Sequence, residues 1–471
     1  MSMRGLRFEV ARVVIEARTP FLVGTGRGDD LRDEIFVADA NGLPTIPGTT
    51  LAGLLRHAVE AADGTERAVA LFGFQESENG AASRVEVSFA QLHGDNGAPV
   101  PFLGADLRSE LLGFLANGMP RDHVRIDARG VADDKGKFDE LLVPTGARFT
   151  FEILLHSGDP PVRMGELLSL IGSIRIGAHT RRGHGVFRVV SAAGRAFDLT
   201  KASDRAQWVK LPRSLSEVAA KGVLETLQVA DRAAEGRRKV TLQLRPRGYW
   251  MFGGGTPHRD EHRRGKSSDT FHDRVPVTEK RVVWNGQRGE VAAAEHIFPA
   301  SSLKGALRHR VAFHARRLSN AWAEEAIDTD KHSHEALEVP EVVELFGTLK
   351  AAGRDSARPG RVFIDDGIVK LGGAGEAKYG QMEHVSLDRL TQGPMDGLLF
   401  GEAPLHGGSI EVAMTIEVTG VSNGAREAFA QALADLCEGR LAIGAGGNKG
   451  FGFSIAQPTW SDGGRWVRGE S

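Results

Sequence analysis

Two glycine-rich loops carry the side chains whose types and spacing are best suited to chemistry. They are IGAHTRRGHGVF, residues 176–187, and IGAGGNKGFGF, residues 443–453. Glycine lets a backbone approach a phosphate group closely, and successive N–H groups can line an anion site. The loops also offer the side-chain donors Arg181, Arg182, His184, Asn448 and Lys449. This pattern predicts binding of a phosphate chain, and a purely structural β-turn is the alternative.

A nucleotide cofactor is not expected at these loops. In the second loop the last glycine is wrongly spaced for a dinucleotide fingerprint, and the loop leads into a strand instead of opening a helix. The loop also lacks the GKS or GKT sequence of a triphosphate-binding loop.

Two predicted helix starts could bind phosphate as well. The segments are PGTTLAGLLR at residues 47–56 and PASSLKGALR at residues 299–308. We expect their hydroxyls to cap the helices, and the free N–H groups beside them could hold an anion. The hydroxyl residues are Thr49, Thr50, Ser301 and Ser302. Lys304 strengthens this interpretation in the second segment, whereas the first has Ala52 there; Arg56 and Arg308 could contact phosphate or form salt bridges.

These segments are parts of a duplicated pattern. Five pairs of short motifs occur in the same order in both halves, 252 to 277 residues apart. The two glycine-rich loops form one pair and the two helix starts form another. The other three pairs are LFG at 71–73 and 345–347, RVEV and RVFI at 84–87 and 361–364, and HVRID and HVSLD at 123–127 and 384–388. A duplicated domain with loop insertions and deletions explains this order.

Composition sets further limits. The 471 residues correspond to two to four domains, and the net charge of −2 excludes a uniformly basic nucleic-acid coat but not a local basic groove. The 59 glycines among 471 residues exceed the usual glycine share of ~7% and indicate many tight loops. A single cysteine, Cys437, excludes a disulfide framework and a Cys-based zinc site. No apolar leader or membrane span is present in the sequence, so we expect a cytoplasmic chain with no membrane partner.

Each half predicts the element order β-α-β-β-α-β, which is ferredoxin-like. In the first half we expect strands near 6–16, 84–89, 148–155 and 186–190, helices near 49–61 and 166–171, and an irregular region from about 90 to 147. In the second we expect strands at 239–245, 361–366, 409–417 and 451–456, with helices at 301–317 and 425–438. The fold class is therefore α+β, with two tandem ferredoxin-like domains.

We expect the first domain at residues 1–198, a polar, helix-prone connector at 199–238 and the second domain at 239–471. Two helices have apolar sides that should pack in the cores. The first side comprises Leu51, Leu54, Leu55, His57 and Val59, and the second comprises Phe429, Leu433, Leu436 and Cys437. Cys437 is therefore expected to be a core residue and not a reactive thiol.

The combined motifs resemble the RAMP superfamily of CRISPR-associated proteins, once in each half. Within it the chain is similar to the backbone subunits of type III effector complexes, joined in tandem. The resemblance implies a CRISPR guide RNA, a complementary target RNA and other effector subunits as partners, in antiviral defence. It also implies a thumb-like insertion in each domain, here carried by residues 126–140 and 387–402.

In type III members of this family an aspartate ahead of a short apolar strand cleaves the paired target RNA. The matching residues are Asp33, in DEIFVAD, and Asp273, in DRVPVTE. A carboxylate can take the proton of the attacking 2′-hydroxyl or hold a hard divalent metal such as Mg²⁺ or Mn²⁺. Asp33 and Asp273 are thus the predicted catalytic and metal-binding residues, with Asp29, Asp30 and Asp269 as helpers; a loop aspartate that only stabilises a turn is the alternative.

Histidines are weaker candidates. We expect His123 and His384, which begin the thumb segments, to be packed residues without a role in catalysis. His258, His262 and His272, with Asp260 and Glu261, could bind a metal, but a solvated or RNA-facing loop is favoured because no regular element frames them. Two other functions stay open: a non-catalytic RNA-binding scaffold, and a guide-processing RAMP ribonuclease that uses histidine or other acid-base residues.

Overall fold

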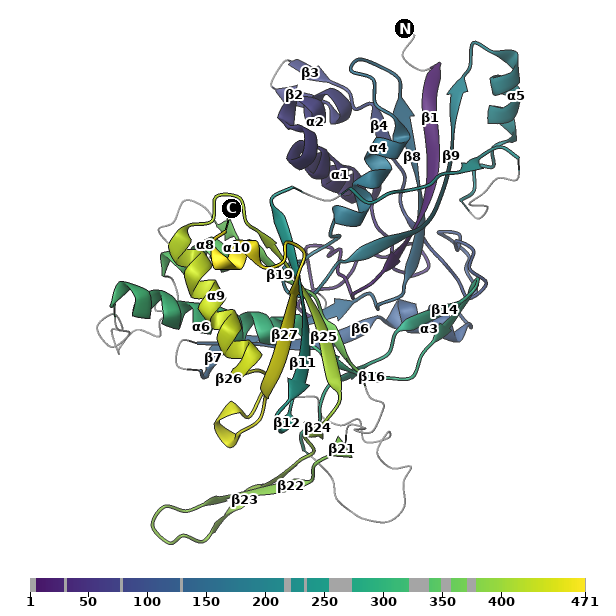
Figure 1. The fold of residues 1–471 in the computed structure, drawn as a ribbon. Helices are drawn as coiled ribbons and strands as arrows, with labels where there is room; N and C mark the ends of the chain where they lie inside the picture. The colour runs from purple at the N-terminus through teal and green to yellow at the C-terminus, as the bar shows by residue number, and fades with distance from the viewer. Residues whose placement is uncertain are drawn as a thin grey trace.

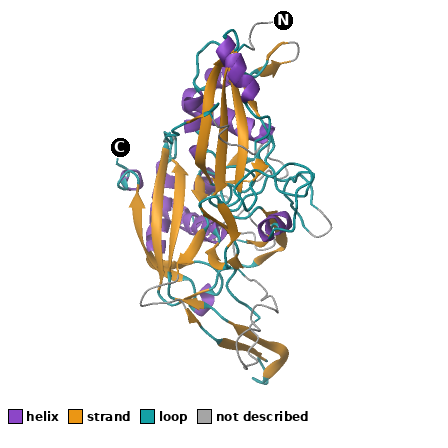
Figure 2. Cartoon of the chain, turned by 90° about the vertical axis from the view of Figure 1, so that its right-hand side faces the viewer, coloured by secondary structure: helices purple, strands orange, loops and turns teal. Residues whose placement is uncertain are grey.

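Two antiparallel β-sheets, one in each half of the chain, form the framework of the structure (Figure 1). The computed structural model describes residues 6–28, 32–76, 79–127, 130–215, 222–232, 235–253, 273–321, 339–348, 357–370 and 378–470. The main helices of each half pack on one face of its sheet (Figure 2), whereas the helix at residues 202–210 packs on the opposite face of the first sheet. No helix in the described residues is both long and apolar enough to cross a membrane.

The first sheet is built around β1 (Arg7–Ala17), which pairs with β8 (Arg148–His156) on one side and β9 (Phe187–Asp198) on the other. β4 (Val85–Val87) extends the sheet beyond β8, and β10 (Glu225–Thr226) extends it beyond β9. The strand order β9-β1-β8-β4 is the order 4-1-3-2 of a ferredoxin-like sheet, and all the pairs are antiparallel.

Apolar side chains of two helices cover this sheet. α1 (Gly48–Asp63) buries Leu51, Leu55 and Val59, and α4 (Met164–Ser169) buries Leu167 and Leu168. Three further helices belong to the first half: α2 (Thr65–Phe72), α3 (Glu110–Asn117) and the 3₁₀ turn η2 (Ile171–Ser173). The short strands are β2 (Phe74–Glu76), β3 (Asn79–Ala81) and β5 (Gln91–Leu92).

The second sheet repeats this plan. β11 (Arg237–Pro246) lies between β25 (Ser409–Glu417) and β27 (Phe453–Trp460), and β19 (Val362–Ile364) pairs with β25. The order β27-β11-β25-β19 is again 4-1-3-2. The sheet continues through β20 (Gly367–Lys370), β16 (Glu295–Phe298) and β13 (Thr278–Glu279) on one side and β26 (Glu438–Ala442) on the other.

The two matching helices pack on this second sheet. They are α6 (Ala300–Ser319) and α9 (Asn423–Cys437), with α8 (Pro340–Phe346) beside them. Cys437 packs against the core, and burial raises the pKa of its thiol to about 11, so it is protonated at neutral pH. The prediction of two tandem ferredoxin-like domains is confirmed, as is the packing of Cys437.

Each domain carries a β-hairpin between its second and third sheet strands. In the first domain it is formed by β6 (Met119–Ile126) and β7 (Ala132–Leu142), and in the second by β22 (Met382–Leu387) and β23 (Pro394–Glu402). The hairpin of the first domain lies beside the second domain, whereas β22 and β23 project away from the body (Figure 1). Both begin several residues earlier than the predicted thumb segments.

The remaining elements are short. The connector holds α5 (Ala202–Lys210), which agrees with its helix-prone composition, and β10. The other strands are β12 (Tyr249–Trp250), β14 (Val282–Asn285), β15 (Arg288–Val291), β17 (Gly347–Thr348), β18 (Arg358–Pro359), β21 (Lys378–Tyr379) and β24 (Leu405–His406); the other helices are η4 (Gly447–Lys449) and α10 (Arg465–Arg468).

Three local predictions were wrong. The hydroxyls of Thr49, Thr50, Ser301 and Ser302 do not cap their helices, because α1 and α6 begin right after Pro47 and Pro299, which places these residues inside the first turn. His57 points to solvent, with 79% of its side chain exposed. The region 90–147 is not irregular throughout, since it contains α3 and the first hairpin.

Candidate active site

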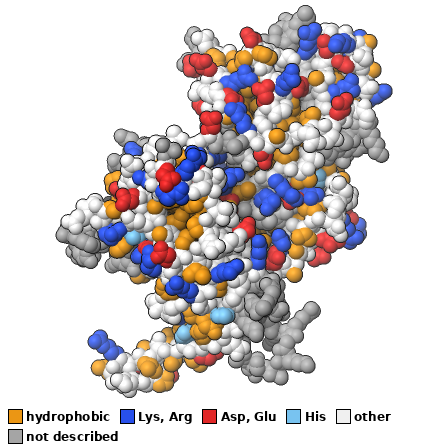
Figure 3. Space-filling model, viewed as in Figure 1, with side chains coloured by type: hydrophobic (Ala, Val, Ile, Leu, Met, Phe, Trp, Pro, Cys, Tyr) orange, Lys and Arg blue, Asp and Glu red, His pale blue; other side chains and the backbone are white. Residues whose placement is uncertain are grey.

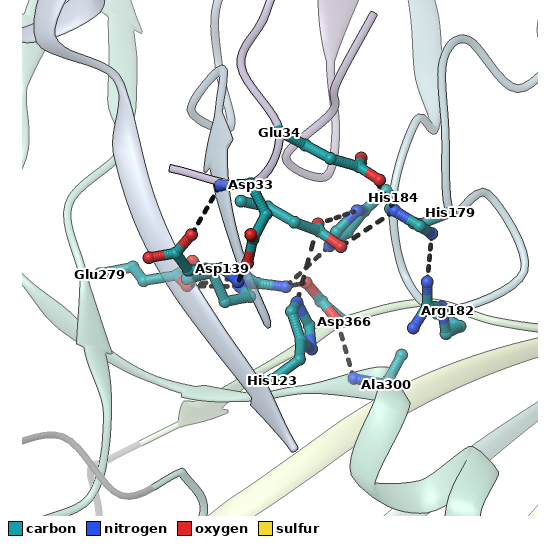
Figure 4. Close-up of polar contacts among 12 residues, drawn as sticks. Asp33, Glu34, His123, Asp139, His179, Arg182, His184, Glu279, Ala300 and Asp366 are labelled. Carbon is teal, nitrogen blue, oxygen red and sulfur yellow. Dashed lines mark hydrogen bonds and ion pairs between the residues drawn. The ribbon is translucent and has the colours of Figure 1, made fainter. Parts of the chain in front are cut away.

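Asp33 is fixed to the first hairpin by a pair of reciprocal hydrogen bonds (Figure 4). Its backbone N–H donates to Oδ1 of Asp139 at 2.9 Å, and its Oδ2 accepts from the backbone N–H of Asp139 at 3.0 Å. Arg32 forms an ion pair with the other oxygen of Asp139 at 3.4 Å. The loop that carries Asp33 is therefore held against β7, and the exposed carboxylate stays at the base of the hairpin.

Asp273 has the equivalent arrangement in the second half. Its Oδ2 accepts from the backbone N–H of Gly401 at 2.8 Å, and its own N–H donates to the Gly401 carbonyl at 2.9 Å. Asp139 and Gly401 stand at the same place on their hairpins, since each directly follows a phenylalanine that stacks on a paired histidine. The two predicted aspartates are thus structural counterparts.

The Asp33 carboxylate can act as an acceptor for a proton or a cation. Only Oδ2 accepts a hydrogen bond among the described residues, which leaves Oδ1 open on the exposed side. Asp139 adds a second carboxylate beside it, so the donor set consists of oxygen atoms and fits a hard cation such as Mg²⁺. The second half has Gly401 instead of Asp139 and so offers one carboxylate fewer.

Three histidines surround Glu140, which follows Asp139 on β7 and is fully buried; Figure 4 labels these histidines, which are His123, His179 and His184. His179 Nε2 lies 3.0 Å from one Glu140 oxygen, and His123 Nε2 and His184 Nδ1 each lie 3.7 Å from the other. Burial alone would raise the pKa of Glu140, but contacts with His123 and His179 outweigh it and hold this pKa well below its usual range. Glu140 is therefore an anion at neutral pH.

The same position in the second half is occupied by Glu402, whose neighbours include two cations. Lys449 Nζ lies 3.0 Å from Glu402, Arg274 lies 3.3 Å away and His384 lies 3.0 Å away. Glu402, Arg274 and Lys449 line a pocket of about 310 Å³ together with Asn448. This pocket joins the predicted loop donors to the neighbourhood of Asp273, because Arg274 directly follows Asp273.

The two halves are locked together by a buried arginine. Arg121, on β6, forms a bidentate ion pair with Glu279 at 2.9 and 2.8 Å and a further pair with Asp366 at 2.6 Å. Asp366 in turn accepts from the backbone N–H of Ala300 at 2.7 Å, at the start of α6. Burial raises the pKa of Glu279, although Arg121 opposes this shift. His184 Nε2 completes the cluster at 3.1 Å from Arg121.

Basic side chains also converge at the junction of the halves, where Figure 3 shows Lys and Arg gathered on the surface. Lys304 Nζ donates to the carbonyls of Arg181 at 2.9 Å and Val362 at 3.1 Å. Arg181 Nε donates to the carbonyl of Gly360, and its guanidinium lies 4.8 Å from the Phe363 ring centre. Burial, followed by repulsion from neighbouring arginines, lowers the pKa of Lys304 to about 7.

The other predicted residues are spread more widely. Arg56 donates to the Gly73 carbonyl at 3.1 Å, which gives it a structural contact within the first domain. Arg182 contacts Nδ1 of His179 and lies over the Phe138 ring. His184 is 1% exposed, so RNA cannot reach it in this structure, and its burial and Arg121 lower its pKa to about 3. Asp29, Asp30, Asp269 and the residues of the 258–272 histidine loop lie outside the described residues.

Sequence reasoning missed Glu140, Glu402, His179 and Arg121. A residue-by-residue comparison of the two glycine loops would have shown that His179 and His184 stand where the second loop has Gly446 and Phe451. The sequence around Arg121 does not indicate its role, because its partners Glu279 and Asp366 lie 158 and 245 residues away in the sequence.

Comparison with known proteins gives a family match in both halves. The model of the RAMP superfamily matches residues 14–188 and 247–454, which is more than half of the chain. No curated protein matches. Among solved structures, the chain is similar to one from a "Cryo-EM structure of the Type III-B Cmr-beta bound to cognate target RNA", with 17% identity and a TM-score of 0.31. That match covers 42% of this chain and 63% of the other.

Proposed function

The chain belongs to the RAMP superfamily, and from this membership we propose that it is a guide-RNA-binding backbone subunit of a type III CRISPR effector that cleaves complementary target RNA. We propose one RAMP domain at residues 1–198, a connector at 199–238 and a second domain at 239–471. Each domain would contribute one cleavage site, centred on Asp33 and on Asp273. Other effector subunits would complete the complex.

The observation that carries this proposal is the repeated placement of the two aspartates. Asp33 and Asp273 occupy the same position relative to their hairpins. Each carboxylate accepts from a hairpin N–H, and each residue's own N–H donates back to the same hairpin residue. Precise positioning is what a carboxylate needs in order to act on one phosphodiester of a bound strand. An aspartate that only stabilised its own turn would need no bond to a distant hairpin.

The proposed reaction is attack of a target 2′-hydroxyl on its adjacent phosphate. It forms a 2′,3′-cyclic phosphate and breaks the bond to the 5′-oxygen of the next nucleotide, which takes a proton from water. The Asp33 carboxylate would hold the hydroxyl and accept its proton, while Asp139 fixes the loop that carries Asp33. A Mg²⁺ or Mn²⁺ ion held by Asp33 and Asp139 would supply electrostatic stabilisation of the phosphate. In the second half, Arg274 and Lys449 would add positive charge near Asp273.

The guide RNA would be held by its sugar-phosphate chain. We propose Arg181, Arg182, Asn448 and Lys449 on the glycine loops as contacts, together with the first turns of α1 and α6. Those turns contain Thr49, Thr50, Ser301, Ser302 and Lys304, with Arg56 and Arg308 on the same helices. His184 is left out of this set because it is buried.

The test is to map cleavage in a reconstituted complex. The full chain would be assembled with partner subunits, guide RNA and complementary RNA, with Mg²⁺ or Mn²⁺ added. We expect two cuts at a fixed spacing, both absent from the Asp33→Ala/Asp273→Ala variant. Unchanged cleavage by the double variant would remove the catalytic assignment. RNA binding without any cut would favour the non-catalytic scaffold.

RNA affinity is also expected to depend on the protonation of Lys304. Since the pKa of Lys304 is about 7, its ammonium is lost as the pH rises from about 6 to about 8, and guide affinity should fall over that range. Without RNA the sign is opposite: the unfolded lysine keeps its proton up to a pH of about 10, so stability should rise with pH above 7.

Filter binding and thermal unfolding across this pH range separate the two effects. Lys304→Met should abolish both pH dependences and reduce the slope of log affinity against log salt by about 1. Lys210→Met, at an exposed position on the connector helix α5, is the matched control and should change neither. Retention of the full pH dependence in Lys304→Met would show that another group is responsible.

A further inference from the structure

Three segments of the first half, two loops and strand β7, bring a mixed set of nitrogen and oxygen atoms to one point. Glu34 comes from the loop of Asp33, Glu140 from strand β7 of the hairpin and His179 from the glycine loop; Figure 4 labels Glu34 and His179. His179 Nε2 lies 3.0 Å from Glu140 Oε1 and 3.2 Å from Glu34 Oε2, and one atom from each residue lies within 4.8 Å of the others. Such spacings allow three ligands to share one ion.

Glu140 has three imidazole neighbours but no paired Lys or Arg side chain among the described residues. It is fully buried, and neither of its oxygens has a hydrogen-bond partner of good geometry. No Lys or Arg side chain forms an ion pair with it in the described part of the chain, and a second carboxylate, Glu34, lies across His179. A buried anion without a paired cation is unfavourable, so this point of the structure attracts a cation.

The second half provides an internal comparison. There the counterpart of Glu140 is Glu402, the counterpart of Glu34 is Arg274 and the counterpart of His179 is Gly446. Arg274 and Lys449 both form ion pairs with Glu402. The second half thus ties its three segments with its own cations. Among the described residues of the first half, Arg182, the counterpart of Lys449, contacts His179 and forms no ion pair with Glu140.

The backbone conformation of His179 also indicates that its side chain has a function. His179 has a φ of +53°, in the left-handed region that favours glycine, and its counterpart Gly446 has a φ of +79°. An imidazole is therefore kept at a position where the duplicate domain uses the residue that this conformation prefers. Strain retained at such a position is typical of a side chain with a function.

We propose that Glu34, Glu140 and His179 bind a divalent transition-metal ion that ties together these three segments around Asp33. The mixture of imidazole and carboxylate ligands suits Zn²⁺, Co²⁺ or Mn²⁺ and does not suit Mg²⁺, which prefers oxygen ligands alone. The site is distinct from the proposed Asp33 site, because Asp33 bonds to Asp139 on the hairpin and makes no contact with His179 among the described interactions. Its existence does not depend on RNA cleavage.

The remaining histidines support this site without binding the ion. His184 accepts from Arg121 through Nε2, so its Nδ1 carries the proton and faces Glu140. His123 Nε2 faces the same Glu140 oxygen. Groups of this kind orient metal ligands. When His179 binds through Nε2, its proton moves to Nδ1, so the occupied site requires Arg182 to leave that nitrogen.

The test measures metal binding by the full chain without RNA. Purified protein would be stripped with chelator and titrated with Zn²⁺ and with Co²⁺, whose visible d–d absorption changes when protein ligands replace water and alter its coordination geometry. We expect one ion per chain, and we expect Glu140→Gln to weaken binding at least tenfold to a hundredfold. Glu402→Gln, at the counterpart position, and Asp33→Asn should both keep the ion.

Two further variants keep the test decisive if Glu140→Gln does not fold. His179→Gly places the residue of the second loop in a backbone that suits it, and it should abolish Co²⁺ absorption while the chain stays folded. Glu34→Arg supplies the cation found in the second half and should abolish metal binding while keeping the thermal stability of the metal-loaded wild type. Absence of stoichiometric binding, or equal binding by Glu140→Gln and wild type, would overturn the proposal, and neither result bears on cleavage by Asp33.

Discussion

Asp33→Asn is expected to remove one of two cuts in the target RNA and to leave the other, with a loss of about 10²- to 10⁴-fold at the affected position. The asparagine oxygen can still accept from the Asp139 N–H, and the residue's own N–H can still donate to the Asp139 side chain. The substitution therefore removes the charge and the proton acceptor but keeps the loop attached to the hairpin. Gel mapping of end-labelled target RNA on the assembled complex measures the result.

Asp273→Asn should remove the other cut, so the two single variants together assign each cut to one half. Asp39→Asn is the matched control, because Asp39 lies in the same segment but accepts from the N–H groups of Asn41 and Leu43 in a local turn. Both cuts should persist in that variant. If Asp33→Asn cleaved normally while Asp33→Ala did not, Asp33 would be a loop anchor and the chemistry would lie elsewhere.

The sequence was sufficient for the framework because the framework depends on local patterns. Alternating residues placed β1 and β11 close to their observed bounds, and helical spacing did the same for α1 and α9. The repeat doubled the evidence at each step, since Asp33 and Asp273 support each other only when the two halves are aligned. The predicted helix cap at Thr49 was wrong, because a capping residue must directly precede its helix and α1 begins one residue earlier than predicted.

The rest of the site depends on contacts between distant segments. Glu140 could be paired with Glu402 only after the hairpins were known, because their flanking sequences differ: Asp139 precedes one and Gly401 precedes the other. The start of α6 shows the same limit. Its first N–H is satisfied by Asp366, a residue 66 positions later, and not by Ser301 or Ser302 nearby.

Arg121→Met is expected to destabilise the junction of the two halves by about 3–5 kcal/mol, the usual cost of breaking a buried ion pair on one side. The side chain of Arg121 is 6% exposed, and its partners Glu279 and Asp366 are 9% and 8% exposed. Methionine is the residue at the counterpart position, Met382, so the change is compatible with the hairpin. Thermal unfolding should show two separated transitions in place of coupled unfolding.

The loss of stability in Arg121→Met should come mainly from two carboxylates, Glu279 and Asp366, that are left buried without Arg121. Adding Glu279→Gln and Asp366→Asn to Arg121→Met should therefore recover part of the stability, and acid should help the single variant, because protonation neutralises Glu279, whose pKa is already raised by burial. Arg108→Met removes an exposed ion pair with Asp106 and should leave thermal unfolding unchanged.

In the assembled complex, Arg121→Met should also make the spacing between the two cuts less uniform, since Arg121 connects the hairpin beside Asp33 with the second domain. Sharp, unshifted cuts together with unchanged unfolding would show that the chain connection alone sets the geometry.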